Sequence, residues 1–160
     1  MSNENGGNAT AAPATSGVKE KFLFCACFVS LIATSFAFVT RFAVLPDWGS
    51  QFNLSATQMG EIGGAGLWPM AVSIILFSLV IDRIGYGTAM VFAFVCHVTY
   101  GILAAFVAPK AGPGAAYTIL YVGSFILALG NGTVEAVINP VVATMFSREK
   151  TKWLNILHAG

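Results

Sequence analysis

The stretch that decides the fold class is residues 117–146, YTILYVGSFILALGNGTVEAVINPVVATMF, in which Glu135 carries the one formal charge. A helix needs about 20 mostly apolar residues to cross the hydrocarbon core of a bilayer, which is roughly 30 Å thick. A strand is excluded because the stretch is too long and because an open sheet edge cannot be satisfied in hydrocarbon. Residues 117–146 therefore predict a membrane-spanning helix.

Three further stretches of the same character precede it, at residues 22–46, 58–81 and 88–108. Each holds at most one formally charged residue, which agrees with the cost of placing charge in lipid. A fifth apolar segment begins near residue 153, and we expect the chain to be truncated barely inside it. The predicted fold class is all-α, a polytopic membrane helix bundle with four full spans and the start of a fifth.

The composition excludes an ordinary soluble domain. The chain of 160 residues is 56% hydrophobic and 9% charged, whereas a soluble domain is about 25% charged. Its net charge of +1 gives no reason to expect a nucleic-acid partner. No glycine loop of the phosphate-binding kind lies between a strand and a helix, which excludes a nucleotide-binding soluble enzyme. Cys25 and Cys27 are too close in sequence for a C-x₂-C metal pair. We expect no enzyme, no cofactor and no metal site. Residues 1–20 predict a disordered tail before a transmembrane helical domain at 21–160.

The basic residues predict the orientation of the chain. With four crossings, the N-terminal tail, the turn at Arg83 and the link after residue 146 lie on one side of the membrane. That side holds six of the lysines and arginines outside the spans, and the opposite side holds Lys110 alone. The positive-inside rule then places the N-terminus in the cytoplasm. We expect a multi-pass protein of the cell (inner) membrane.

Glu135 is the first candidate for function, because an ionisable residue deep in a span marks a functional site by default. Asn131 and Asn139 lie four residues to either side and therefore share its helical face. Such a polar face must point at protein or water. We predict that the three residues bind substrate or protons. The alternative is a hydrogen-bonded network that only holds helices together.

Arg41 is the second candidate, on a face of the first span with Ser30 and Thr34. It either lines the cavity, where it pairs with Glu135 or attracts an anionic substrate, or it snorkels to the interface. His158 lies at the start of the fifth segment, too little of which is present for a role to be assigned.

Residues 53–60, NLSATQMG, with the following span and the turn DRIG at 82–85, resemble part of the major facilitator superfamily. The family's loop between its second and third helices reads G-x-x-x-D-R/K-x-G, and Ser78 stands here at the first glycine. In the family this loop acts at the cytoplasmic gate between two halves. The resemblance implies that role for Asp82, Arg83 and Gly85.

Residues 130–140, GNGTVEAVINP, and residues 154–160, LNILHAG, resemble the fourth helix and the start of the fifth in the fucose–proton symporter branch. There the acid of the fourth helix is tied to substrate binding and proton coupling, and Glu135 matches that acid. The family has twelve helices in two halves, with the first and fourth lining the cavity. The resemblance implies an N-terminal half, whose partner is the missing remainder of the same transporter.

The leading functional hypothesis is a secondary active transporter for proton-coupled, sugar-type uptake by alternating access. Its partners are then a small-molecule substrate, protons and the lipid bilayer. One alternative is transport of an organic or inorganic anion, with Arg41 as its anchor. Another is a non-transporting membrane sensor or interaction subunit. We expect this chain alone not to transport, since four spans form no full pathway.

Overall fold

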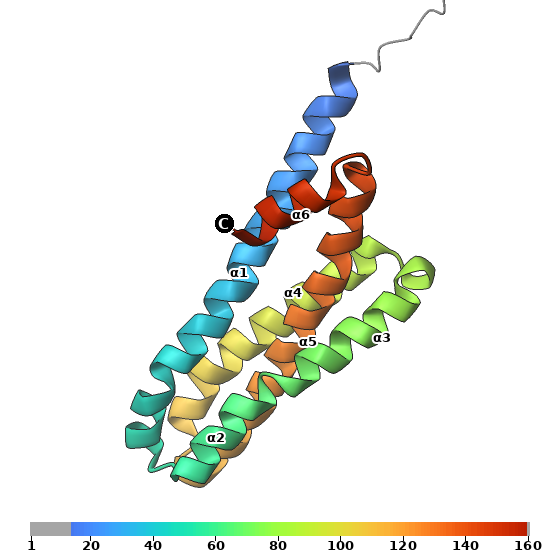
Figure 1. The fold of residues 1–160 in the computed structure, drawn as a ribbon. Coiled ribbons are helices and arrows are strands. Elements are labelled where there is room, and N and C mark those ends of the chain that lie inside the picture. The colour runs from blue at the N-terminus through green and yellow to red at the C-terminus, as the bar shows by residue number, and fades with distance from the viewer. Residues whose placement is uncertain (1–13, 160) are drawn as a thin grey trace, which may run out of the picture.

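The computed structural model describes residues 14–159, and every regular element in that range is helical (Figure 1). The prediction of an all-α fold is confirmed. The helices are α1 (Ala14–Phe52), α2 (Ala56–Ala65), α3 (Trp68–Ile84), α4 (Tyr86–Ile102), α5 (Pro113–Met145) and α6 (Lys150–Ala159). A π-helical turn, η1 (Leu103–Val107), and a 3-10 turn, η2 (Ala108–Lys110), extend α4.

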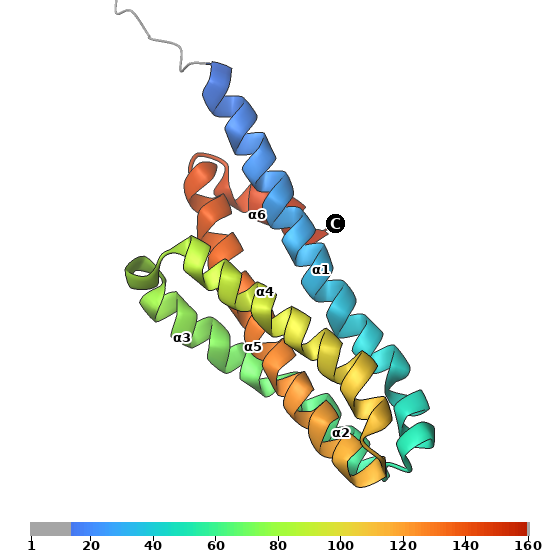
Figure 2. The ribbon, with the colours of Figure 1, turned by 180° about the vertical axis from the view of Figure 1, so that it is seen from behind.

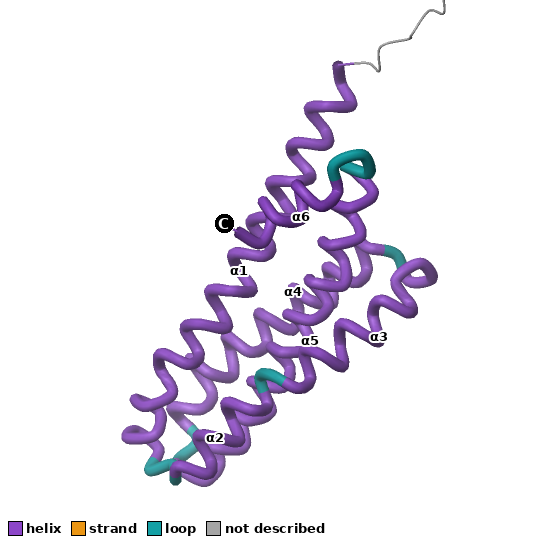
Figure 3. The backbone as a smooth tube through the Cα atoms, viewed as in Figure 1, coloured by secondary structure: helices purple, strands orange, loops and turns teal. Residues whose placement is uncertain are grey.

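Within residues 14–159, four helical stretches are long and apolar enough to cross a membrane, as predicted. They are Lys19–Phe52, Ala56–Ile84, Tyr86–Lys110 and Pro113–Met145. The loops between them are short (Figure 3).

Helix α5 is the centre of the bundle and contacts α1, α2, α3, α4 and α6. Figures 1 and 2, which view the molecule from opposite sides, both show α5 running along its middle. Within the most apolar window of its span 61% of the residues are buried, against 11% in the span formed by α1. The fourth span is therefore the one whose polar groups face other helices rather than the outside of the bundle.

Two glycines allow α5 to approach its neighbours closely. A Cβ atom at Gly132 would lie 2.4 Å from the carbonyl oxygen of Met70 in α3. A Cβ atom at Gly130 would lie 2.9 Å from Cβ of Cys96 in α4. Because these two residues pack against different helices, the intervening Asn131 is held at a fixed rotation.

The first helix is longer at both ends than the sequence predicts. Residues 14–20, which we expected to be disordered, are helical, and residues 1–13 of the predicted tail lie outside the described residues. Lysine and glutamate in this segment are good helix formers, and extending a helix is easier than starting one. At the other end α1 continues through Pro46 to Phe52, although a proline inside a helix removes one hydrogen bond and crowds the preceding turn.

The second span consists of two helices, whereas the sequence predicts one uninterrupted span over residues 58–81. Helix α2 ends at Ala65, the chain turns through Gly66 and Leu67, and α3 begins at Trp68. Pro69 then lies in the first turn of α3, where a missing N–H costs nothing. The fifth segment also begins earlier than predicted, at Lys150 rather than near residue 153.

Candidate functional site

The polar face of α5 opens into a cavity of about 370 Å³ between α1, the turn after α2, and α5. Asn131 is 2% exposed and Glu135 is half-buried, and both line this cavity. The other lining residues come from α1 and from the start of α3, and they are Thr34, Ser35, Phe38, Val39, Leu67 and Met70. Two hydrogen-bonding side chains of α5 thus face a mainly apolar hollow, part of whose wall is exposed.

Glu135 is also one end of a chain of hydrogen bonds between α5 and α6. The amide nitrogen of Asn139 donates to Oε2 of Glu135 at 3.1 Å. The amide oxygen of Asn139 lies 2.9 Å from Nε2 of His158. Because an amide oxygen only accepts, Nε2 of His158 carries the hydrogen in this bond. The sequence singled out no role for His158, since its partner lies 19 residues away and no local spacing joins them.

Glu135 borders two further cavities. One, of about 410 Å³, lies between α1, α5 and α6 and has His158 in its wall. The other, of about 330 Å³, lies beside the turn between α3 and α4 and includes Asp82 and Tyr86. Glu135 therefore lines three cavities, each formed with a different set of neighbouring helices.

The turn between α3 and α4 is built by Gly85. Its φ of +81° lies in the region that favours glycine, and its N–H donates to the carbonyl of Ile81 at 2.8 Å. Arg83 occupies the last turn of α3, where a positive charge is favourable. Asp82 and Arg83 are both exposed, and neither is in an ion pair within the part of the chain that the structure describes.

Arg41 lies in a place that the sequence did not predict. It is 1% exposed, and its Nη1 donates to the carbonyls of Ile62 at 2.9 Å and Gly63 at 3.2 Å. These carbonyls belong to the last turn of α2, the end that carries partial negative charge. The Gly63 carbonyl also accepts from the N–H of Gly66 at 3.2 Å. The guanidinium also lies 4.5 Å from the ring centre of Phe42. Arg41 therefore neither snorkels nor, among the described side chains, pairs with Glu135.

Arg41 fits only because residue 66 is glycine. A Cβ atom at Gly66 would lie 1.9 Å from Nη1 of Arg41. Nε and Nη2 of the same guanidinium are buried and have no hydrogen-bond partner among residues 19–159. The guanidinium of Arg41 thus occupies the space beside the break between α2 and α3.

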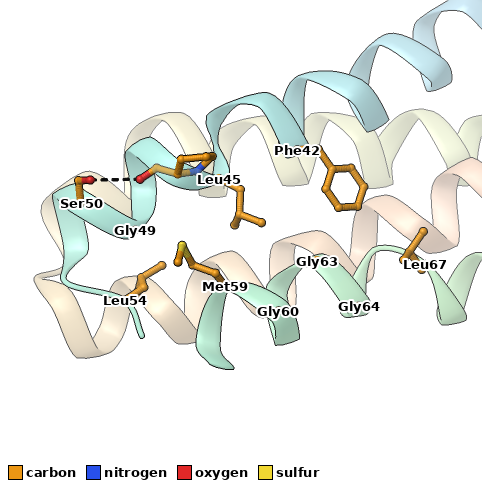
Figure 4. A pocket seen from close by; sticks show the side chains of 11 residues that line it. Phe42, Leu45, Gly49, Ser50, Leu54, Met59, Gly60, Gly63, Gly64 and Leu67 are labelled. Atoms are coloured by element: carbon orange, nitrogen blue, oxygen red, sulfur yellow. Dashed lines mark hydrogen bonds between the residues drawn. The ribbon is translucent and has the colours of Figure 1, made fainter. Parts of the chain in front are cut away.

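A larger groove, of about 810 Å³, lies between the end of α1 and α2 (Figure 4). Its labelled side chains are mostly apolar, and the Ser50 hydroxyl is turned back to the carbonyl of Pro46 in its own helix at 3.3 Å. None of the described residues in its wall is charged. The groove therefore offers little to orient a polar solute, and the polar groups gather around Glu135 instead.

A protein-family model described as Major Facilitator Superfamily matches residues 23–160. The chain belongs to the major facilitator superfamily. No curated protein and no solved structure matches it significantly. As a major facilitator protein the chain is a multi-pass membrane protein of a family of secondary transporters for small solutes, not of enzymes. The predicted membership is confirmed, and the likeness to the fucose–proton symporter branch stays a prediction.

Proposed function

We propose that this major facilitator chain takes part in proton-coupled uptake of a sugar or a similar small neutral solute. The observation that carries the proposal is the position of Glu135 and Asn131 in one cavity between α1, α3 and α5. A carboxylate and an amide together supply the donors and acceptors that hydroxyl groups of a solute need.

Glu135 has two roles in this proposal, as the proton carrier and as a ligand for substrate hydroxyls. It has no positive partner among the described side chains, so its charge is free to be neutralised by a proton. Asn131 Oδ1 is buried and has no hydrogen-bond partner in the same part of the chain, which leaves it available to a solute. Asn139 instead orients the carboxyl group.

Alternating access requires that the cavity close on one side at a time. We propose that Asp82, Arg83 and Gly85 form the cytoplasmic gate, because their turn lies at one end of the bundle and Asp82 shares a cavity with Glu135. Exposed, unpaired charges on such a turn are free to pair with a second half of the transporter. That second half is itself part of the proposal.

The test is uptake into proteoliposomes by the longest reading frame that contains this chain, driven by an inward proton gradient. Radiolabelled neutral sugars are the first substrates to try, with Glu135→Gln as the variant and Glu61→Gln as a matched control in another span. We expect Glu135→Gln to lose proton-driven uptake while substrate exchange without a gradient is retained. Proton-driven uptake that is unchanged in Glu135→Gln would remove Glu135 from the mechanism.

Anion transport anchored by Arg41 has less support. The guanidinium is 1% exposed and bonds to backbone carbonyls of α2 rather than facing the cavity of Asn131 and Glu135. Inhibition of uptake by excess organic anions, lost in Arg41→Gln, would favour this alternative. The third alternative is a non-transporting membrane sensor. No uptake of any solute tested, together with a change in the protein's tryptophan fluorescence when a solute is added, would favour it.

A further inference from the structure

We propose that the turn between α5 and α6 binds the headgroup of an anionic phospholipid. The turn comprises residues 146–149 and directly follows the fourth span, which ends at Met145. It therefore lies where this span leaves the hydrocarbon and meets the headgroup region of the bilayer. The proposed transport function does not use this surface, so a test of lipid binding is independent of the uptake assay.

A hollow of about 310 Å³ opens at this turn and has both a polar and an apolar wall. A phospholipid presents a matching pair of surfaces, a charged phosphate and the apolar chains attached to it through glycerol. A free anion in water would use only the polar wall. The polar wall is formed by Ser147, Arg148 and Glu149, and the apolar wall by Met145, Phe146 and Trp153.

The charge beside the hollow is positive. Arg148, Lys150 and Lys152 follow one another along the chain, and all three are exposed. The acid among them, Glu149, is already engaged, because its Oε1 lies 3.3 Å from Nζ of Lys152. Within the part of the chain that the structure describes, Arg148 and Lys150 have no ion-pair partner. Two cations are thus left for an anion.

The place of the lysines in α6 raises the positive potential further. Lys150 and Lys152 belong to the first turn of this helix, which contains no acidic residue. The first turn is the positive end of the helix dipole, so a cation there is unfavourable. A phosphate beside the two lysines would offset both their mutual repulsion and their repulsion by the dipole.

An aromatic cluster holds the turn in shape before anything binds. The ring of Trp153 stacks on that of Phe146 with 4.1 Å between centres and packs edge-on against Phe24 of α1 at 5.0 Å. The N–H of Glu149 donates to the carbonyl of Phe146 at 2.9 Å. Figures 1 and 2 both show α6 leading from this turn toward α1. Because the turn is preorganised, binding loses little free energy to ordering it.

The test is the quenching of a bimane label by spin-labelled lipids, with the label at Thr151→Cys after replacement of the native cysteines by alanine. Thr151 is exposed in the first turn of α6. The longest reading frame that contains this chain is placed in phosphatidylcholine nanodiscs. Phosphatidylglycerol or phosphatidylcholine with a spin label close to the headgroup is then added. We expect half-quenching at a lower mole fraction of phosphatidylglycerol than of labelled phosphatidylcholine.

Substitutions at the turn are expected to change this preference. Arg148→Gln combined with Lys150→Gln should weaken phosphatidylglycerol binding by about fivefold for each charge removed, the usual contribution of a basic residue near anionic lipid. Arg148→Lys keeps the charge and should retain the preference, and Glu149→Gln frees Lys152 and should strengthen it. The matched control is Arg83→Gln, which removes an exposed, unpaired charge at another turn of the same end of the bundle (Figure 1).

Three outcomes would overturn the inference. Equal quenching by the two lipids would show that the turn does not recognise anionic headgroups. An equal loss of preference in Arg83→Gln would mean that all basic residues at this end attract anionic lipid diffusely. Relief of quenching by millimolar inorganic phosphate would show that the turn binds a soluble anion, for which the apolar wall has no use.

Discussion

A buried arginine shows how this chain keeps a charge inside an apolar bundle. Arg41 makes two hydrogen bonds to the carbonyls of Ile62 and Gly63, and its charge faces the negative end of α2. The ring faces of Phe38 and Phe42 lie at 5.5 and 4.5 Å from the guanidinium carbon, which adds cation–π attraction. The residue thus belongs to the structure of the first two spans.

At the residue scale we predict that Arg41→Met lowers the stability of the chain. Methionine keeps the apolar stem but removes the Nη1 donor that the carbonyls of Ile62 and Gly63 share. Hydrogen bonds from a charged donor are worth about 1.5–3 kcal/mol, and we expect a loss of about that size. Reversible unfolding in mixed micelles measures it.

The matched control for this prediction is Lys110→Met, which removes an exposed charge at the end of the third span. We expect it to change the stability by no more than about 0.5 kcal/mol. Equal stabilities of the two variants would show that the bonds of Arg41 contribute nothing.

At the scale of the element, the break between α2 and α3 depends on the pair Arg41 and Gly66. A methyl group at residue 66 would collide with the guanidinium, because Nη1 of Arg41 lies 1.9 Å from the position that a Cβ atom would take there. We predict that Gly66→Ala destabilises the chain when Arg41 is present and has little effect in an Arg41→Met background. A double-mutant cycle measures this coupling, and residues in contact typically couple by about 0.5–3 kcal/mol. Additive effects would argue that the break stands without the arginine.

The contact of α5 with α3 gives a second prediction at this scale. A Cβ atom at Gly132 would lie 2.4 Å from the backbone carbonyl oxygen of Met70. A side-chain rotation cannot relieve this clash, so one of the two helices would have to shift. We expect Gly132→Ala to destabilise the chain by about 1–3 kcal/mol, as overpacking does.

Gly60→Ala is the control for the contact of α5 with α3, because no atom of the described chain lies within 4 Å of a Cβ there. It is expected to be neutral or slightly stabilising, since alanine is the better helix former. Thermal unfolding of the two variants in the same detergent compares them directly. Similar midpoints would mean that the two helices are not closely packed at Gly132.

At the scale of the whole molecule, we propose that the N-terminus lies in the cytoplasm. The turn at Arg83 and the end of the third span at Lys110 then lie on opposite sides of the membrane. After replacement of the native cysteines by alanine, we expect Lys110→Cys to react with a membrane-impermeant maleimide on intact cells. Arg83→Cys is expected to react only after permeabilisation. The reverse pattern would invert the topology.

Much of the fold was predictable because hydropathy is a local property of the chain. The long apolar run around Glu135 can be recognised as a span without any knowledge of the helices that pack against it. The four-residue spacing of Asn131, Glu135 and Asn139 likewise places them on one helical face without that knowledge. The same local view missed the break at Gly66, since a glycine before Trp68 and Pro69 is also compatible with one uninterrupted span. The guanidinium that occupies the space beside Gly66 comes from another helix, α1.

The sequence by itself determined that residues 22–146 contain four membrane spans, and that Glu135, Asn131 and Asn139 share one face of the fourth. Only the tertiary structure decided their partners. It brought His158 from α6 to Asn139 and placed Arg41 on the carbonyls of α2 instead of beside Glu135. The physical reason is that a helical period sets directions around one axis, whereas contacts depend on how separate helices rotate and pack against each other.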